Sequence, residues 1–428
     1  MGYLQFGFSQ QSYKPYDTVS HNYKKSFLLG FKNRYLKKEK EVKSKFRGKK
    51  KKELLKMYKE QFDELKENFD KGELYYEKKN REYLHKILNH IIKYNPELKK
   101  HKFYLEFSRM PEPNAYSIGD GTLIIDFDLI NFLDNEAQLA SVISHEISHY
   151  LLHHREKSYE KHVDIVLSKN YRKKIKNIKK TSYNRQSKAE SLLKGIVYSK
   201  RHKSRKHEYQ ADSLGLLLFS HTKYNPEEFV NALKKLDSVD VDKDSLSVDF
   251  LKKFFSTKHQ KFNPEWLEIE DFSEYQYSKD KNWDIDSLKT HPNIKNRILK
   301  VEKLIKKHNL KNSNSDFAVD SKFYNDLKRR SVYEQIFTYY YLKEYGQGLY
   351  RTLIGLQKNP DDKFLQKMFI KFFEKLNKAK KEFRLGRYVP TINPKKQTDS
   401  EQLFINFIDN FSDIEFDRLN KDFKQKFK

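Results

Sequence analysis

The segment LASVISHEISHYLLHH, residues 139–154, constrains the fold and the chemistry of this chain more than any other stretch. At about 100° per residue, an α-helix places His145 and His149 about 40° apart, so both imidazoles can reach one metal ion. Glu146 projects beside the two histidines, where it is poorly placed as a ligand but well placed to contact a metal-bound water. This HExxH pattern indicates a metal site with its own general base.

The opposite face of the same helix is apolar, which predicts that the helix is buried in a core. The apolar positions are Leu139, Ala140, Ile143, Ile147, Tyr150 and Leu151. One face is therefore structural and the other chemical. Because the short motif also arises by chance, a third protein ligand is needed to establish a catalytic metal site.

The segment SRKHEYQADSLG, residues 204–215, supplies the third ligand. Glu208 and Asp212 are four residues apart and share one face of a predicted helix. We expect Glu208 to bind the metal and Asp212 to accept the other N–H of His145, which fixes the tautomer of that imidazole. The alternative is an exposed acidic pair on a basic helix. The chain has no cysteine, so a zinc ion must be held by His, Asp or Glu.

The remaining pattern predicts an α+β fold that is mostly α-helical, with a small β-sheet beside the active-site helix. PNAYSIGDGTLIIDF reads as two short strands joined by GDG. We expect an irregular segment over residues 1–33 and the domain with the metal motif over 34–310. That domain begins with basic helices and carries a helical insertion over 155–205. Residues 317–428 form an α-helical C-terminal domain, whose central hairpin is typical of a tetratricopeptide repeat or of a plain helical bundle.

Four segments carry a family resemblance, in the order NAYSIGDGTLII, NEAQLASVISHEISHYLLHH, SRKHEYQADSLG and THPNIKNRI. With them the chain resembles the gluzincin metallopeptidases that include the heat-shock protease HtpX and the CAAX prenyl protease. The resemblance implies a zinc endopeptidase with one Zn²⁺ per chain, bound by His145, His149 and Glu208, with Glu146 as the base. The best-known relatives span membranes. This chain lacks a run of about 20 apolar residues, so it resembles the soluble, exported branch.

Four residues outside the metal motif are candidates for other roles at the site. His291, in THPNIKNRI, is expected to stabilise the oxyanion or to occupy a fourth zinc position in a resting state, and the alternative is a structural role. Arg297 is expected to anchor its loop by ion pairing. Asn114 and Ala115 precede a strand that, beside the metal helix, can pair with an extended substrate. For Asn114 a turn-forming side chain is the alternative.

The net charge of +28 raises nucleic acid or anionic lipid as partners. The simpler interpretation, which we favour, is solvated, lysine-coated helix faces, and nucleic-acid recognition motifs are missing. The start, YLQFGFSQ, resembles the end of a secretory signal, and the alternative is an ordinary N-terminus. We expect the cell envelope (periplasm) or secretion, with the cytoplasm as the alternative.

The leading functional hypothesis is a zinc metalloendopeptidase that hydrolyses proteins or peptides, in envelope protein quality control, with C-terminal helices that gather protein partners or substrate. Two other hypotheses remain at this point. One is a protease-like chaperone or assembly factor with a gated site. The other is a basic nucleic-acid-binding protein that uses its lysine-rich helices.

Overall fold

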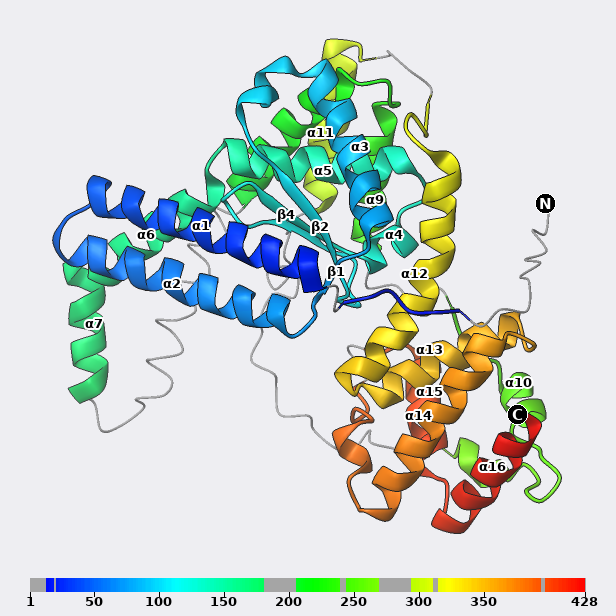
Figure 1. Cartoon of the computed structure of the whole chain (residues 1–428). Helices are drawn as coiled ribbons and strands as arrows, with labels where there is room; N and C mark the ends of the chain where they lie inside the picture. Colours follow the sequence, from blue (N-terminus) through cyan, green and yellow to red (C-terminus); the bar gives the residue numbers. More distant parts are fainter. Residues whose placement is uncertain are drawn as a thin grey trace. The chain divides into compact units, whose positions relative to one another are not determined.

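The computed structural model describes residues 13–18, 21–180, 205–238, 244–268, 294–310, 315–393 and 397–427 (Figure 1). The chain folds as two compact units. The first, the site unit, consists of Tyr16–Ser238 and Lys281–Lys328. The second, the helical unit, consists of Met1–Pro15, Val239–Asp280 and Arg329–Lys428.

A four-stranded sheet lies at the centre of the site unit. Its strands are β1 (Leu74–Tyr75), β2 (Tyr104–Ser108), β3 (Ala115–Ser117) and β4 (Thr122–Asp126), in the spatial order β1-β2-β4-β3. β2 and β4 are parallel, and the two outer pairs are antiparallel. β3 and β4 are the two strands that the sequence predicts around GDG. Gly119 and Gly121 lie between them with φ near +90°, a conformation that glycine adopts without strain.

Both faces of this sheet are covered by helices. On one face, Leu105, Phe107, Leu123 and Ile125 share a core with α3 (Lys78–Tyr94) and α5 (Glu136–Leu151). On the other face, Ile124 packs with aromatic residues of α1 (His21–Lys45) and α2 (Gly48–Asp70), which run side by side as a hairpin (Figure 1). β2 and β4 are buried on both faces at nearly every position, and the centre of β4 is a continuous apolar run, Leu123 to Ile125.

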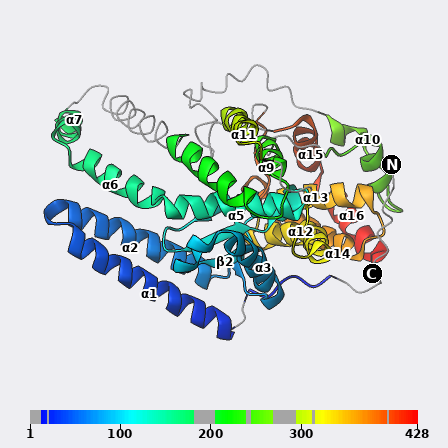
Figure 2. The same cartoon turned by 90° about the horizontal axis from the view of Figure 1, so that it is seen from above.

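The other helices of the site unit are α4 (Asp128–Phe132), α6 (His154–Leu167), α7 (Lys169–Lys180), a helix over residues 205–220, α9 (Glu227–Asp237) and α11 (Ile294–His308). α6 leads on from α5 and packs beside α2 (Figure 2). α6 and α7 account for residues 155–180 of the expected insertion, and 181–204 lie outside the described residues.

The irregular segment expected over residues 1–33 is helical from His21 onward. Phe27 and Phe31, four residues apart, are buried on the face of α1 that meets the sheet. Lysines on either side of this pair, at positions 24, 25 and 32, obscure the helical period in the sequence, because their long side chains reach solvent from the flanks of the helix.

The metal-motif helix, α5, has the boundaries that its capping residues favour. The side chain of Asn135 accepts a hydrogen bond from the backbone N–H of Gln138, which caps the N-terminus. The helix ends at Leu151. His153 adopts a left-handed conformation with φ 53°, and α6 begins at the next residue. The predicted apolar stripe of α5 is confirmed, because its first four members are fully buried.

Glu136, in the first turn of α5, is a fully buried carboxylate that accepts five hydrogen bonds. Its donors are the hydroxyls of Tyr83 and Tyr224 and the backbone N–H groups of Ala318, Val319 and Asp320, at 2.7–2.9 Å. The carboxylate therefore ties three segments, far apart in the sequence, to the start of the metal-motif helix.

Exchange of Glu136 for glutamine should lower the free energy of unfolding by about 1–3 kcal/mol. The new NH₂ group cannot accept from the buried backbone N–H of Asp320, which loses its partner. Urea unfolding followed by circular dichroism measures the change. Glu227→Gln, at an exposed position, is the control and should be neutral. A Glu136→Gln variant as stable as the wild type would contradict this role.

The helical unit is built from α10 (Val248–Phe254), α13 (Tyr345–Lys358), α14 (Lys363–Lys381), α15 (Asp399–Asp409) and α16 (Asp413–Lys426). α12 (Ser321–Leu342) contributes residues to both units. The core is rich in phenylalanine, and α13 and α14 form the predicted helical hairpin. The tetratricopeptide character of this hairpin stays a prediction.

The unit boundaries differ from the predicted domains, 34–310 and 317–428. Leu251, Phe255 and Trp266 are buried in the same core as the C-terminal helices, so this stretch belongs to the helical unit. The mixed composition around these three residues, in which charged residues of both signs interrupt the apolar positions, conceals where they pack. The fold as a whole is α+β and mostly helical, as predicted.

Candidate metal centre

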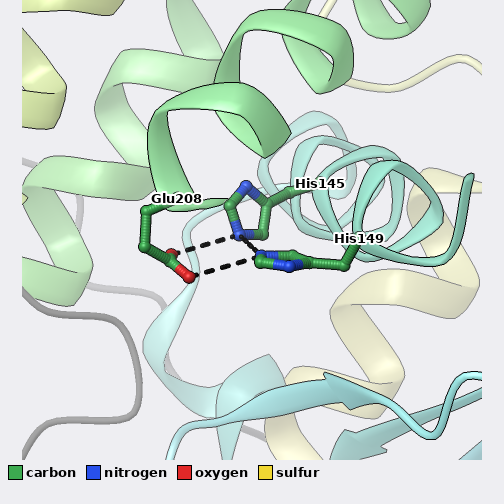
Figure 3. A group of neighbouring side chains, drawn as sticks. All are labelled: His145, His149 and Glu208. Carbon is green, nitrogen blue, oxygen red and sulfur yellow. Dashed lines mark hydrogen bonds and ion pairs between the residues drawn. The ribbon is translucent and has the colours of Figure 1, made fainter. Parts of the chain in front are cut away.

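Three side chains converge between α5 and the 205–220 helix (Figure 3). The Nε2 atoms of His145 and His149 are 3.0 Å apart. The Glu208 carboxylate lies opposite, with one oxygen 3.5 Å from Nε2 of His145 and the other 3.4 Å from Nε2 of His149. The predicted meeting of the two distant segments is therefore present.

These distances fit one small divalent cation. Ligand atoms placed about 2.1 Å from a tetrahedral zinc lie roughly 3.4 Å from one another. The two imidazole nitrogens are 3.0 Å apart, and each lies 3.4–3.5 Å from a different oxygen of Glu208, so these separations are close to that value. Two imidazoles and a carboxylate are also the kind of donor set that leaves a fourth position open in catalytic zinc sites.

Small residues let the two helices approach at the level of the metal ligands. A Cβ added to Gly215 would lie 3.0 Å from Cα and 3.2 Å from the backbone nitrogen of His145. Ala211, one turn earlier, is fully buried. The close approach at Gly215 is missed in the sequence, although its spacing of four residues from Ala211 is the signal.

Asp212 contacts the outer nitrogen of the first histidine, as expected. Its Oδ1 is 2.9 Å from Nδ1 of His145. Arg297 of α11 holds the same carboxylate with two hydrogen bonds of 2.7 Å, and its third nitrogen is 2.9 Å from Glu208. Arg297 thus fixes both acidic residues of the 205–220 helix, a more specific role than the loop anchor that the sequence indicates.

The charges in this cluster set the protonation of its members. Burial lowers the pKa of His145, but the hydrogen bonds to Asp212 and Glu208 outweigh burial and raise that pKa to about 9. Burial raises the pKa of Asp212, and Arg297 with His145 more than reverses the effect, so that its pKa is lowered. For Arg297, the nearby carboxylates, Glu146 among them, overcome burial and raise the pKa.

Glu146 is buried in α5 beside the first histidine. Its negative charge is one of those that raise the pKa of Arg297, and its carboxylate is not one of the three groups whose donor atoms converge. This arrangement agrees with a base beside the metal ligands.

A third histidine belongs to this cluster. Nδ1 of His154 is 2.9 Å from Nδ1 of His149, and its Nε2 is 3.3 Å from Oε1 of Gln210. The ring of His207 stacks on the ring of His154, with centroids 4.1 Å apart. Neither contact is predicted from the sequence.

β3 is the strand that the sequence assigns to substrate. Within the described part of the chain it pairs with β4 alone, and it lies against α5. Ala115 is buried, and the backbone carbonyl of Asn114 accepts a hydrogen bond from Asp126. His291 lies outside the described residues.

A model of peptidase family M48 matches residues 78–305, which is more than half of the chain. The chain belongs to peptidase family M48. This family includes HtpX and the CAAX prenyl protease, so the resemblance seen in the sequence is confirmed. No curated protein matches the chain.

Membership of family M48 makes the chain a metallopeptidase, a hydrolase with protein substrates. The matched range contains the converging histidines, Glu208 and Arg297. No helix in the ranges that the structure describes has the length and apolar character needed to cross a bilayer.

Proposed function

We propose that this M48 peptidase is a zinc-dependent endopeptidase in which His145, His149 and Glu208 hold one Zn²⁺ and Glu146 is the general base. The observation that carries the proposal is the convergence of three donor atoms at separations that suit tetrahedral zinc. The three side chains come from two helices, and 58 residues lie between His149 on the first and Glu208 on the second.

The chain's own residues divide the work of hydrolysis. Zinc, when bound, supplies Lewis acidity, which makes a coordinated water more acidic and polarises a substrate carbonyl. Glu146 takes a proton from the attacking water as the new C–O bond forms. It then delivers the proton to the amine nitrogen as the C–N bond breaks. Asp212 holds the N–H at Nδ1 of His145, which leaves the lone pair of Nε2 facing the metal position.

Substrate binding and the oxyanion complete the proposal. The outer edge of β3, beginning at Asn114 and Ala115, would pair with an extended peptide through backbone hydrogen bonds, which gives affinity with little sequence preference. β3 lies against α5 and has a single strand partner among those described, which supports this assignment. His291 is proposed as the residue that stabilises the oxyanion.

The biological setting is a further part of the proposal. Quality control of envelope proteins fits a peptidase that selects extended backbone over sequence. The net charge of +28 also fits a location near anionic lipid. The helical unit would then gather protein partners or substrate.

The test is metal analysis of the purified protein beside a Glu208→Ala variant. We expect about one zinc ion per chain in the wild type and a much smaller content in the variant, because a carboxylate ligand is removed. Casein cleavage should be lost after chelation and should return with Zn²⁺. Glu227→Ala, at an exposed position on α9, should keep the metal. A Glu208→Ala variant with wild-type zinc content would defeat the ligand assignment.

A further inference from the structure

We infer that His154 is a positioning residue for the metal centre, which fixes the tautomer and the orientation of His149 and links it to Gln210. This inference rests on the proposed function, since it takes His149 as a zinc ligand. The observation behind it is the short contact of 2.9 Å between the Nδ1 atoms of the two histidines.

The hydrogen atoms in this contact follow from ligation. A histidine that binds metal through Nε2 carries its proton on Nδ1. Nδ1 of His149 must therefore donate, and Nδ1 of His154 must accept. The proton of a neutral His154 then lies on Nε2, where it faces the side-chain oxygen of Gln210 at 3.3 Å. Each polar atom along this path has a partner of the correct type.

The two metal-binding histidines are thus held by different chemistry from the same helix. Asp212 holds His145 directly with a carboxylate. For His149 the connection to the 205–220 helix runs through a neutral imidazole and ends at Gln210. Glu208 lies on the same helix as Gln210 and Asp212. This one helix therefore supplies one metal ligand and orients the two histidine ligands.

Packing holds His154 in place. The residue is 3% exposed, and the ring of His207 stacks on it with an interplanar angle of 9°. The left-handed conformation of His153 ends α5, so that His154 begins α6 with its ring against the preceding helix. A straight helix would place residues 149 and 154 about 140° apart around its axis, where their rings could not meet.

The test compares the zinc affinity of the full chain with that of two His154 variants, by competition with a chromophoric chelator. His154→Ala removes the acceptor and should weaken zinc binding roughly 10- to 100-fold. His154→Asn places a carboxamide oxygen near the position of Nδ1, so it should recover most of the affinity. His153→Asn is the matched control. The imidazole of His153 is largely exposed, and asparagine tolerates the left-handed conformation of this position.

The outcomes separate this inference from the proposed function. If the wild type binds no zinc, the proposed function fails. If the wild type binds zinc and His154→Ala binds equally well, the inference is overturned while the zinc site stands. Equal losses in His154→Ala and His154→Asn, with a lower melting temperature of both metal-free variants, would also overturn it, because His154 would then only fill space.

Discussion

Replacement of Glu146 by glutamine should lower the rate of peptide hydrolysis roughly 10²- to 10⁴-fold and leave zinc binding intact. Glutamine keeps the shape of the side chain but cannot take a proton from water. The Glu146 carboxylate is not among the three groups with converging donor atoms, so its loss removes no ligand. Cleavage of casein and zinc content, both measured on the same preparation, report the two properties separately.

The burial of Glu146 requires a control for the effect of removing a charge. Glu160→Gln neutralises another glutamate of the same unit. Glu160 lies on α6 and forms an ion pair with Lys45 of α1. That variant should cleave casein at the wild-type rate. Full activity in Glu146→Gln would exclude this residue as the base. Loss of both activity and zinc would instead show that Glu146 supports the metal site.

The parts of the site that the sequence predicts are those encoded by short helical spacing. His145 with His149 and Glu208 with Asp212 are each four residues apart, and one turn of helix fixes how such a pair points. That the two pairs meet is not encoded locally, and the expectation came from the need of a catalytic zinc for a third ligand, with support from the family resemblance. The structure agrees, with donor atoms of both pairs in one cluster.

The contacts that the sequence could not predict depend on tertiary geometry. Helical spacing argues against a contact between His149 and His154, and the contact exists because the backbone turns at His153. For Arg297 the sequence indicates only an ion-paired loop anchor, and its bond to Asp212 depends on how α11 packs. In the same way, lysine-rich sequence hides the early start of α1 and mixed sequence hides the place of Trp266.

Arg297 should prove the most important single residue for the stability of the metal-free protein. It is 2% exposed, and it pairs with Asp212 and Glu208, which are each 3% exposed. Arg297→Ala leaves two buried carboxylates close together with His145 as their remaining cationic partner. Loss of one partner from a buried ion pair costs about 3–5 kcal/mol, and we expect a decrease of that size in the free energy of unfolding at pH 7.

The dependence of this loss of unfolding free energy on pH and zinc distinguishes the effect of broken ion pairs from the effect of lost packing. Because the folded-state pKa of Asp212 is lowered, its contribution is present above the unfolded pKa, near 4, and disappears as pH falls through the folded value. The difference between Arg297→Ala and the wild type should therefore shrink in acid. Saturating zinc should also reduce it, because the ion supplies positive charge beside Glu208.

Urea unfolding of Arg297→Ala with EDTA at pH 7 and at about pH 2, and with Zn²⁺ at pH 7, provides the measurement. Lys303→Ala, at an exposed position on the same helix, should remain within about 0.5 kcal/mol of the wild type under all three conditions. A loss in Arg297→Ala that is equally large in acid and in zinc would assign the effect to the cavity left by the side chain. The ion pairs would then not be what holds Glu208 and Asp212 in position for the metal.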